Sequence, residues 1–193
     1  MTRRVGLIVI GGSAGAIEVL RDLLQQLPAR FGSAVAIVVH VPAEGPHLLL
    51  EVLQSAGGPP MKLAEDKEPI VPGTIYLGVP DYHLLVESGR TFALSHDERV
   101  HFCRPAIDVL FESAADAYGP DLMGVVLSGA NADGAAGLKA IADRGGITVV
   151  QSLETAEMIA MPAAALEAAP GSLELNVSGL VDTLRAHGEP NDR

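Results

Sequence analysis

Four runs of continuously apolar residues occur along the chain, at intervals that suit the strands of a buried sheet. They occupy residues 5–10, 34–39, 122–127 and 147–150. Apolar positions that do not alternate with polar ones indicate burial on both faces, as in a parallel sheet. The stretches between these runs have helical spacing and a length suited to crossover helices, at residues 16–27, 46–56, 105–118 and 134–144. The pattern predicts a doubly wound α/β fold, with a mostly parallel sheet and helices on both faces.

The pattern changes in the middle of the chain. Residues 67–95 contain prolines, glycines and short β-rich pieces, and "ESGR" at residues 87–90 suits a hairpin turn, so we predict an antiparallel hairpin insertion there. Beyond residue 171 the chain offers one more short strand, at residues 173–177, and a last helix. A length of 193 residues suits one compact domain. We predict a single domain over residues 1–187 and a polar tail over residues 188–193.

Charge and composition exclude several classes of partner. The net charge is -11 and the chain has no tryptophan, so nucleic acid is not expected to bind. The single cysteine, Cys103, cannot form an internal disulfide and has no Cys/His cluster around it in the sequence, so we predict a reducing, cytoplasmic location, no metal and no cofactor. Since no stretch approaches the roughly 20 apolar residues of a membrane span, we expect no membrane insertion.

A glycine-rich turn follows the first apolar run. Its glycines, Gly11, Gly12 and Gly15, do not have the spacing of a dinucleotide-binding turn, and the second run ends in His40 rather than an acidic residue. The turn also lacks the Gly-Lys-Ser/Thr of a phosphate-binding P-loop. It does match G-x-S-x-G, the strand-to-helix bend that carries a nucleophile, which here is Ser13. The alternative is that Ser13 only caps the helix that follows.

Two further side chains at strand ends complete a possible catalytic set. If the second strand lies beside the first, His40 and Ser13 emerge at the same edge of the sheet, where a neutral imidazole can accept the serine proton. The run at residues 122–127 leads into a second glycine-rich loop that contains Asp133, a carboxylate able to orient that imidazole. The alternative for Asp133 is a helix cap. The amide of Ala14, directly after the serine, is the first candidate for an oxyanion-binding group.

At this point the chain resembles a known family, the catalytic domain of the CheB-type protein-glutamate methylesterases of chemotaxis. The stretches that carry the resemblance run from about residue 5 to 175 and include "IGGSAGA", "VVHVP", "RPAIDVLFESAA", "LSGANADGAAGL" and "MPAAALEAA". The resemblance implies a serine carboxylesterase with Ser13 as nucleophile, His40 as general base and acid, and Asp133 as its orienting partner. It implies as substrate the glutamate γ-methyl esters on the helical cytoplasmic domains of methyl-accepting chemoreceptors, with release of methanol, and in some members glutamine deamidation.

The residues around this set are also expected to shape the oxyanion and substrate loops: Gly12, Ala14, Gly15, Ala130, Arg104 and Met161. The family usually has Met-Gly-Asn where this chain has Ala-Asn-Ala at residues 130–132, and this departure motivates an alternative, a catalytically idle binding or scaffolding module. Family members also usually carry an amino-terminal receiver domain, whereas this sequence begins just before its first strand. We therefore expect a stand-alone catalytic domain, whose control can come from a separate regulatory protein.

Overall fold

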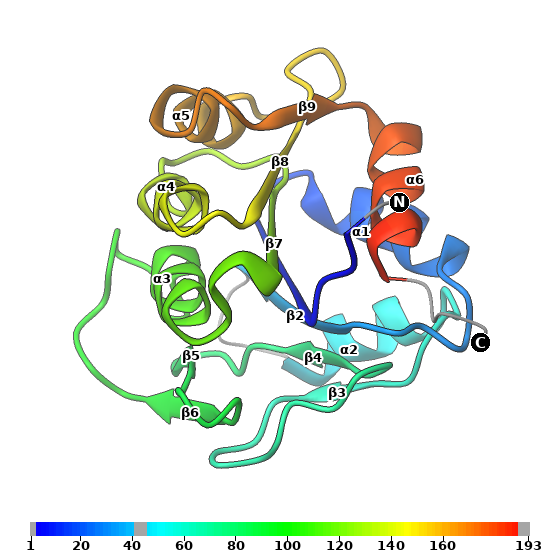
Figure 1. Ribbon diagram of the computed structural model, residues 1–193, viewed down its shortest axis with the longest axis vertical. Helices are drawn as coiled ribbons and strands as arrows, with labels where there is room; N and C mark the ends of the chain where they lie inside the picture. Colours follow the sequence, from blue (N-terminus) through cyan, green and yellow to red (C-terminus); the bar gives the residue numbers. More distant parts are fainter. Residues whose placement is uncertain (1–2, 41–45, 189–193) are drawn as a thin grey trace.

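A seven-stranded parallel sheet forms the centre of the computed structural model, which describes residues 3–40 and 46–188 (Figure 1). The strand order is β3-β4-β2-β1-β7-β8-β9, and every neighbouring pair is parallel. The strands are β1 (Leu7–Gly12), β2 (Ala34–Val39), β3 (Met61–Leu63), β4 (Ile75–Leu77), β7 (Leu122–Val126), β8 (Ile147–Gln151) and β9 (Leu173–Leu175). The chain builds one half of the sheet on one side of β1 and then the other half on the opposite side.

Helices cover both faces of the sheet (Figure 1). One face carries α1 (Ala16–Gln26), α2 (Pro46–Gln54) and α6 (Val177–Gly188), and the other carries α3 (Ile107–Tyr118), α4 (Ala135–Asp143) and α5 (Ala160–Ala168). A short 3-10 helix, η1 (Gly119–Asp121), leads from α3 into β7. This arrangement confirms the predicted doubly wound fold.

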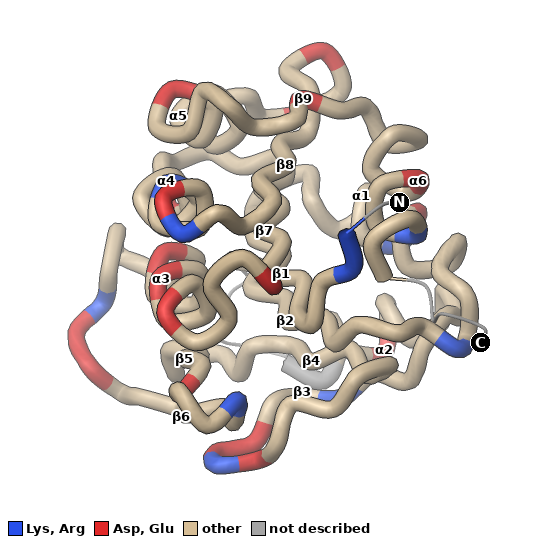
Figure 2. The backbone as a smooth tube through the Cα atoms, viewed as in Figure 1, with Lys and Arg blue, Asp and Glu red and all other residues tan. Residues whose placement is uncertain are grey.

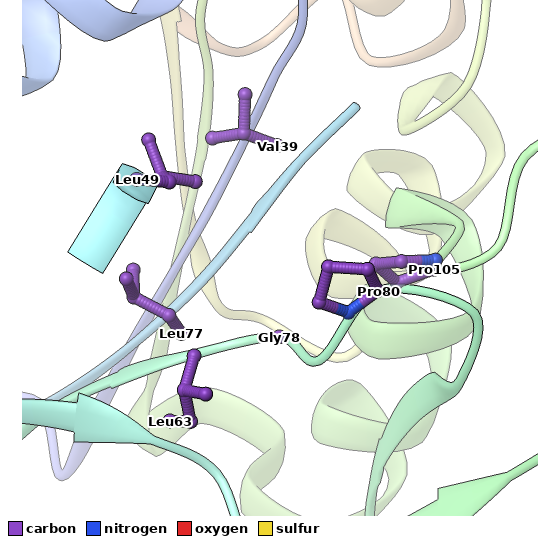
Figure 3. Close-up of a pocket in the computed structure, with 7 residues that line it drawn as sticks. All are labelled: Val39, Leu49, Leu63, Leu77, Gly78, Pro80 and Pro105. Carbon is purple, nitrogen blue, oxygen red and sulfur yellow. The ribbon is translucent and has the colours of Figure 1, made fainter. Parts of the chain in front are cut away.

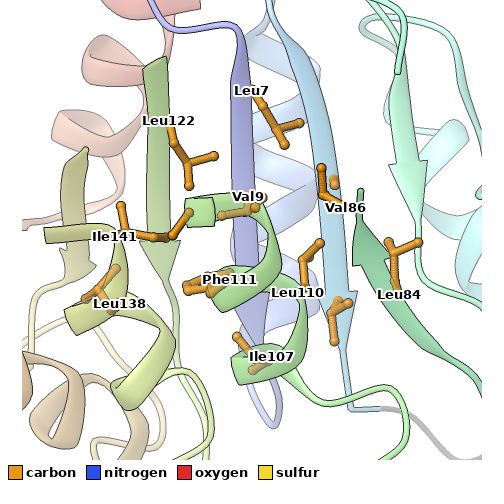
Figure 4. Close-up of a cluster of buried hydrophobic side chains, with 14 of the residues drawn as sticks. Leu7, Val9, Leu84, Val86, Ile107, Leu110, Phe111, Leu122, Leu138 and Ile141 are labelled. Atoms are coloured by element: carbon orange, nitrogen blue, oxygen red, sulfur yellow. The ribbon is translucent and has the colours of Figure 1, made fainter. Parts of the chain in front are cut away.

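The central strands are buried on both sides, which explains why their sequences are continuously apolar. Along β1, Leu7 and Val9 join the core beneath α3 and α4, whereas Ile8 and Ile10 join the core beneath α1 and α6. Figure 4 shows the first of these cores, with Phe111 of α3 packed over the sheet. Burial of each such side chain contributes about 1.5–3 kcal/mol. Acidic and basic residues are absent from β1, β2, β7 and β8, and most of them lie on the helices and loops (Figure 2).

The predicted hairpin insertion is only partly correct. Within residues 67–95, β5 (His83–Val86) and β6 (Phe92–Ser95) do form an antiparallel pair, closed by a turn in which the Arg90 amide donates to the Glu87 carbonyl at 2.8 Å. However, β4 leaves this region to join the main sheet between β2 and β3, and β3 was not predicted at all. Strands of three residues are too short to produce a recognisable hydrophobic period.

The carboxyl-terminal part differs from the prediction in three details. Helix α5 was not predicted, because alanine dominates it and leaves little contrast between an apolar and a polar face. The predicted strand at residues 173–177 stops at Leu175, since Val177 already begins α6. That helix includes His187 and Gly188, and residues 189–193 of the predicted tail lie outside the described residues. Across the described ranges, no helix is both long and apolar enough to cross a membrane.

Candidate active site

Three strand ends bring the predicted residues to one edge of the sheet. Strand β1 lies between β2 and β7, and Ser13 and His40 are the next residues after the registered pair Gly12 and Val39. The His40 amide donates to the Gly12 carbonyl at 3.1 Å, and the Ser13 amide donates to the Ser128 carbonyl beyond β7 at 2.9 Å. The helices after β1 and β7 leave toward opposite faces of the sheet, and ligand sites of doubly wound folds form at such a switch point.

A partly buried hydrogen bond joins two of the three predicted side chains. The Nε2 atom of His40 lies 2.7 Å from Oδ2 of Asp133, whose side chain is fully buried. Burial alone would raise the pKa of Asp133, but the hydrogen bonds from His40 and from the amides of Asp108 and Ile107 outweigh it and hold the pKa below its ordinary value. The carboxylate is therefore ionised at neutral pH, as a group that stabilises an imidazolium must be.

The other ring nitrogen of His40 is left available. Its Nδ1 atom is buried, and neither it nor the Ser13 hydroxyl has a hydrogen-bond partner among the described residues. The hydrogen bond between these two groups is thus not formed in this structure, although their backbones are neighbours in adjacent strands. Catalytic hydrogen bonds of unliganded enzymes are often long or misaligned and tighten when substrate binds. A buried nitrogen without a partner is costly, which favours an arrangement in which the serine hydroxyl supplies one.

Ser13 does not cap the helix that follows it. The residue at the start of α1 is Gly15, in a left-handed conformation, and this helix start has no side-chain cap hydrogen bond. The half-buried Ser13 side chain therefore has no structural role that the described contacts reveal. This observation weakens the capping alternative and leaves the nucleophile interpretation as the better account of the turn.

Asp133 does cap a helix, but not the one predicted. Its carboxylate accepts hydrogen bonds from the first amides of α3, those of Ile107 at 2.7 Å and Asp108 at 2.9 Å. Asp108 in turn accepts the amides of Gly134 and Gly137, at the start of α4, at 2.9 and 2.7 Å. The two carboxylates thus cap each other's helices. Burial raises the pKa of Asp108. The hydrogen bond from the Gly137 amide opposes this increase, and the negative charge of Asp133 adds to it.

The nucleophile turn is supported by residues that the sequence analysis did not select. The Ser128 hydroxyl donates to the Ala14 carbonyl at 2.7 Å and accepts the Met158 amide at 2.9 Å, so it ties the turn after β1 to the loop before α5. Its own amide donates to the buried side chain of Gln151 at 2.9 Å. A polar residue at the end of an apolar run was the available signal for Ser128 and Gln151.

We expect Gly15→Ala to disturb this turn. Gly15 has φ of 79°, and an added Cβ would lie 2.7 Å from Cβ of Glu157 and 2.8 Å from the Ser128 hydroxyl. Strain at positive φ costs roughly 1–2 kcal/mol, and overpacking adds about 1–3 kcal/mol. Gly57→Ala is the matched control, because Gly57 has φ of 86° but nothing within 4 Å of its added Cβ. Urea unfolding should show a larger loss of stability for Gly15→Ala than for Gly57→Ala; equal losses would contradict this view of the turn.

The remaining predicted residues occupy different places around the edge. The Arg104 guanidinium donates hydrogen bonds to Asp81 and Asp97: Nη2 donates to Oδ1 of Asp81 at 2.6 Å, and Nη1 donates to the carbonyl of Asp97 at 2.8 Å. Met161 is fully buried, and its amide donates to the carbonyl of Gly129. Both residues therefore support loops in this structure, and a role for either in substrate binding stays a prediction.

Two residues of the predicted oxyanion loops face solvent, Ala14 and Ala130. The Ala14 amide has no acceptor among the residues that the structure describes, so it is free to bind an oxyanion beside Ser13. Gly12 is the buried last residue of β1, where an added Cβ would lie 2.5 Å from Cβ of Ala16. Gly12 thus shapes the turn through its small size, and its part in binding stays a prediction.

Cys103 lies closer to the site than its sequence position suggests. Its sulfur and the ligand atoms of His40 and Asp133 all lie within 4.8 Å of one another. No such cluster is expected from the sequence, because the three residues are far apart along the chain. Burial and the nearby Asp133 raise the pKa of the thiol, so it stays protonated and is a weak nucleophile at neutral pH.

A small apolar pocket borders the His40 side of the edge (Figure 3). Its walls contain no ionisable side chain: they are Val39, Leu49, Leu63, Leu77, Gly78, Pro80 and Pro105. Val39 immediately precedes His40. The pocket therefore offers apolar contact next to the histidine rather than chemistry of its own.

A parallel α/β sheet that presents a G-x-S-x-G turn beside a histidine hydrogen-bonded to a buried carboxylate has the arrangement of a serine hydrolase. Comparison with known proteins gives the family: a model of the CheB methylesterase family matches residues 8–184. The chain belongs to the CheB methylesterase family.

Individual relatives agree with this assignment. A protein of Leptospira interrogans is 47% identical over 161 residues, which are 83% of this chain and 83% of that protein. A Pseudomonas aeruginosa protein named protein-glutamate methylesterase/protein-glutamine glutaminase 3 is 39% identical over 174 residues, 89% of this chain but 52% of that protein. The crystal structure of the Thermotoga maritima CheB methylesterase catalytic domain is similar with a TM-score of 0.88 and 28% identity, covering 93% of this chain and 97% of that one.

Proposed function

We propose that this protein is a serine carboxylesterase that hydrolyses glutamate γ-methyl esters on methyl-accepting chemoreceptors and releases methanol. The observation that carries the proposal is the partly buried His40–Asp133 hydrogen bond, at the strand end next to the unengaged hydroxyl of Ser13. Membership of the CheB family supports the substrate class. The proposed location is the cytoplasm, where the helical signalling domains of such receptors lie.

In the proposed reaction, the Ser13 oxygen attacks the ester carbonyl while Nδ1 of His40 accepts the hydroxyl proton. Asp133 stabilises the imidazolium, and the Ala14 amide donates to the oxyanion of the tetrahedral intermediate. Collapse of the intermediate breaks the bond to the methoxy group, which leaves as methanol with the proton from His40. Water, activated by the same histidine, then hydrolyses the acyl-enzyme to glutamate and free Ser13. A glutamine side chain would follow the same route with ammonia as the leaving group.

The helix start at α3 fixes the position of the base. Two amides of the first turn of α3 hold the Asp133 carboxylate, which leaves Oδ2 aligned with the imidazole. Because these groups belong to packed secondary-structure elements, the pair is set before substrate arrives. Such preorganisation lowers the reorganisation needed when charge develops on the imidazole.

Exposed apolar side chains around the edge provide a surface for a protein substrate. Phe102 is 95% exposed at the tip of a tight turn between the bridged residues Val100 and Cys103. Met158 and Ile159 are also exposed, in the loop that Ser128 ties to Ala14. An aromatic side chain held out beside the reaction centre suits contact with the apolar positions of a helical receptor domain.

We expect Phe102→Ala to raise KM for a methylated receptor fragment about tenfold, equivalent to about 1.4 kcal/mol of lost binding. Its rate on a small ester such as p-nitrophenyl acetate should not change, because a small substrate does not reach the tip of the turn. Val71→Ala is the control, since the Val71 side chain is also exposed, at 51%, but precedes β4, at the amino end of the strands. If Phe102→Ala lost activity equally on both substrates, Phe102 would contribute to the folded structure and not to recognition of the receptor.

The function itself is tested by methanol release from a receptor fragment carrying methyl groups on its glutamates. The proposal requires methanol to appear in proportion to enzyme and free glutamate to replace the methyl ester. The family's Met-Gly-Asn is replaced at residues 130–132, yet the His40–Asp133 contact is intact, which favours an active enzyme over an idle module. Receptor binding without methanol release would support the idle module instead.

A further inference from the structure

We propose that Cys103, His40 and Asp133 form a binding site for a thiophilic divalent cation, foremost Zn²⁺, and that occupation of this site inhibits the esterase. The three ligand atoms already lie within 4.8 Å of one another. Tetrahedral zinc with bonds of about 2.0–2.3 Å places its ligands roughly 3.3–3.8 Å apart. To bind it, the ligand atoms that lie further apart than this would move slightly closer, and the His40–Asp133 hydrogen bond would open.

The donor set is the kind that selects zinc. A thiolate, an imidazole and a carboxylate together suit Zn²⁺ better than Mg²⁺ or Ca²⁺, which prefer oxygen ligands alone. Three protein ligands also leave the fourth position of a tetrahedral ion open to water or substrate. The site would therefore hold an exchangeable ion rather than a permanently enclosed one.

Each ligand is held from a separate part of the fold. The amides of α3 anchor Asp133, and the backbone hydrogen bond to Gly12 anchors His40 at the end of β2. The Cys103 thiol donates to the carbonyl of His101 at 3.3 Å and lies 3.7 Å from Nδ2 of Asn131. Metal sites with oriented ligands bind more tightly than sites that must be assembled.

The surrounding charges favour a cation. Asp108 is a second buried carboxylate, and with His101 and Asp133 it forms a neighbouring group whose ligand atoms also lie within 4.8 Å of one another. Two carboxylates this close repel each other, and a divalent cation at Asp133 would offset that repulsion. Zn²⁺ would also displace the thiol proton of Cys103, which leaves to solvent.

Inhibition follows from the identity of the ligands. Two of them are the pair that the proposed reaction needs, and a cation between Nε2 of His40 and the Asp133 carboxylate replaces their 2.7 Å hydrogen bond. The histidine can then no longer be stabilised as an imidazolium. This consequence rests on the proposed function, whereas the binding does not.

Binding is tested with Co²⁺ as a spectroscopic substitute on metal-free protein. We expect a thiolate-to-cobalt charge-transfer band in the wild type, lost in Cys103→Ser and displaced by added Zn²⁺. His101→Gln is the matched control, because His101 belongs only to the neighbouring group, and it should keep the band. Circular dichroism of each variant shows whether it is folded. Absence of the band in folded wild-type protein, or its loss in His101→Gln but not in Cys103→Ser, would overturn the proposed site.

Inhibition is tested separately by ester hydrolysis in buffered Zn²⁺. At a concentration that lowers the wild-type rate tenfold, Cys103→Ser should keep most of its rate, and a chelator should restore the wild type. Equal inhibition of both proteins would overturn the inhibitory role. If no esterase activity is found, the proposed function fails, and the cobalt spectrum still decides whether the metal site exists.

Discussion

Ser13→Ala is expected to reduce methanol release from a methylated receptor fragment by about 10⁴- to 10⁶-fold, because it removes the attacking oxygen. The Ser13 side chain is half-buried and has no hydrogen-bond partner among the described residues, so its loss should leave stability nearly unchanged. A large kinetic effect without a structural one is typical of a nucleophile. The measurements are initial rates of methanol formation and urea unfolding of the same preparations.

Ser55→Ala is the matched control for this prediction. Ser55 is an exposed serine beyond α2, and its hydroxyl donates to the carbonyl of Val52 at 2.7 Å. We expect its methanol release to equal that of the wild type. If Ser13→Ala kept a substantial part of the wild-type rate, Ser13 would not be the nucleophile, and the catalytic set would have to be reassigned.

Asp133→Asn should lower the turnover number by about 10³- to 10⁴-fold. An amide cannot stabilise the imidazolium, and its NH₂ group can turn toward His40 and favour the wrong tautomer. The substitution also weakens the cap of α3, because only one amide oxygen remains to accept the hydrogen bonds of Ile107, Asp108 and His40. Unsatisfied buried donors cost about 1–3 kcal/mol, which urea unfolding at neutral pH would measure.

The pH dependence of stability separates the two capping carboxylates. The pKa of Asp133 is lowered in the folded protein, so its ionised form stabilises the fold above about pH 3.9, its unfolded pKa, and this contribution is lost as the pH falls through the folded value. The stability advantage of the wild type over Asp133→Asn should therefore shrink in acid. The pKa of Asp108 is raised, so the wild type should gain stability relative to Asp108→Asn as the pH falls. If the stability difference from the wild type changed with pH in the same direction for both variants, the opposite directions of the two pKa shifts would be contradicted.

The long apolar runs made most of the fold predictable from the sequence. Strands β1, β2, β7 and β8 are buried on both faces, so their hydrophobicity is continuous and easily recognised. Strands β3 and β4 carry three residues each; β4 joins the sheet by pairing with β2, and β3 by pairing with β4, and no local sequence pattern records either pairing. Helix α5 was missed because its alanine-rich sequence lacks a polar face.

From the sequence, the positions of the site residues could be predicted only where they follow directly from the ends of the parallel strands. Parallel strands place their carboxyl ends at one edge, which is why Ser13, His40 and Asp133 could be expected to converge. The sequence gives no information on which carboxylate caps which helix, because Asp108 and Asp133 exchange caps through tertiary packing. The approach of Cys103 to the histidine likewise depends on the path of the loop between β6 and α3.

The central claim is that Ser13 is a nucleophile activated by His40, and covalent labelling tests it most directly. A fluorophosphonate reacts with an activated serine hydroxyl, and mass spectrometry of the digested protein locates the adduct. We expect one modified peptide carrying the label on Ser13 in the wild type, no label in Ser13→Ala and much slower labelling in Asp133→Asn. Folded wild-type protein that stays unlabelled, or that carries the label on another residue such as Ser128, would contradict it.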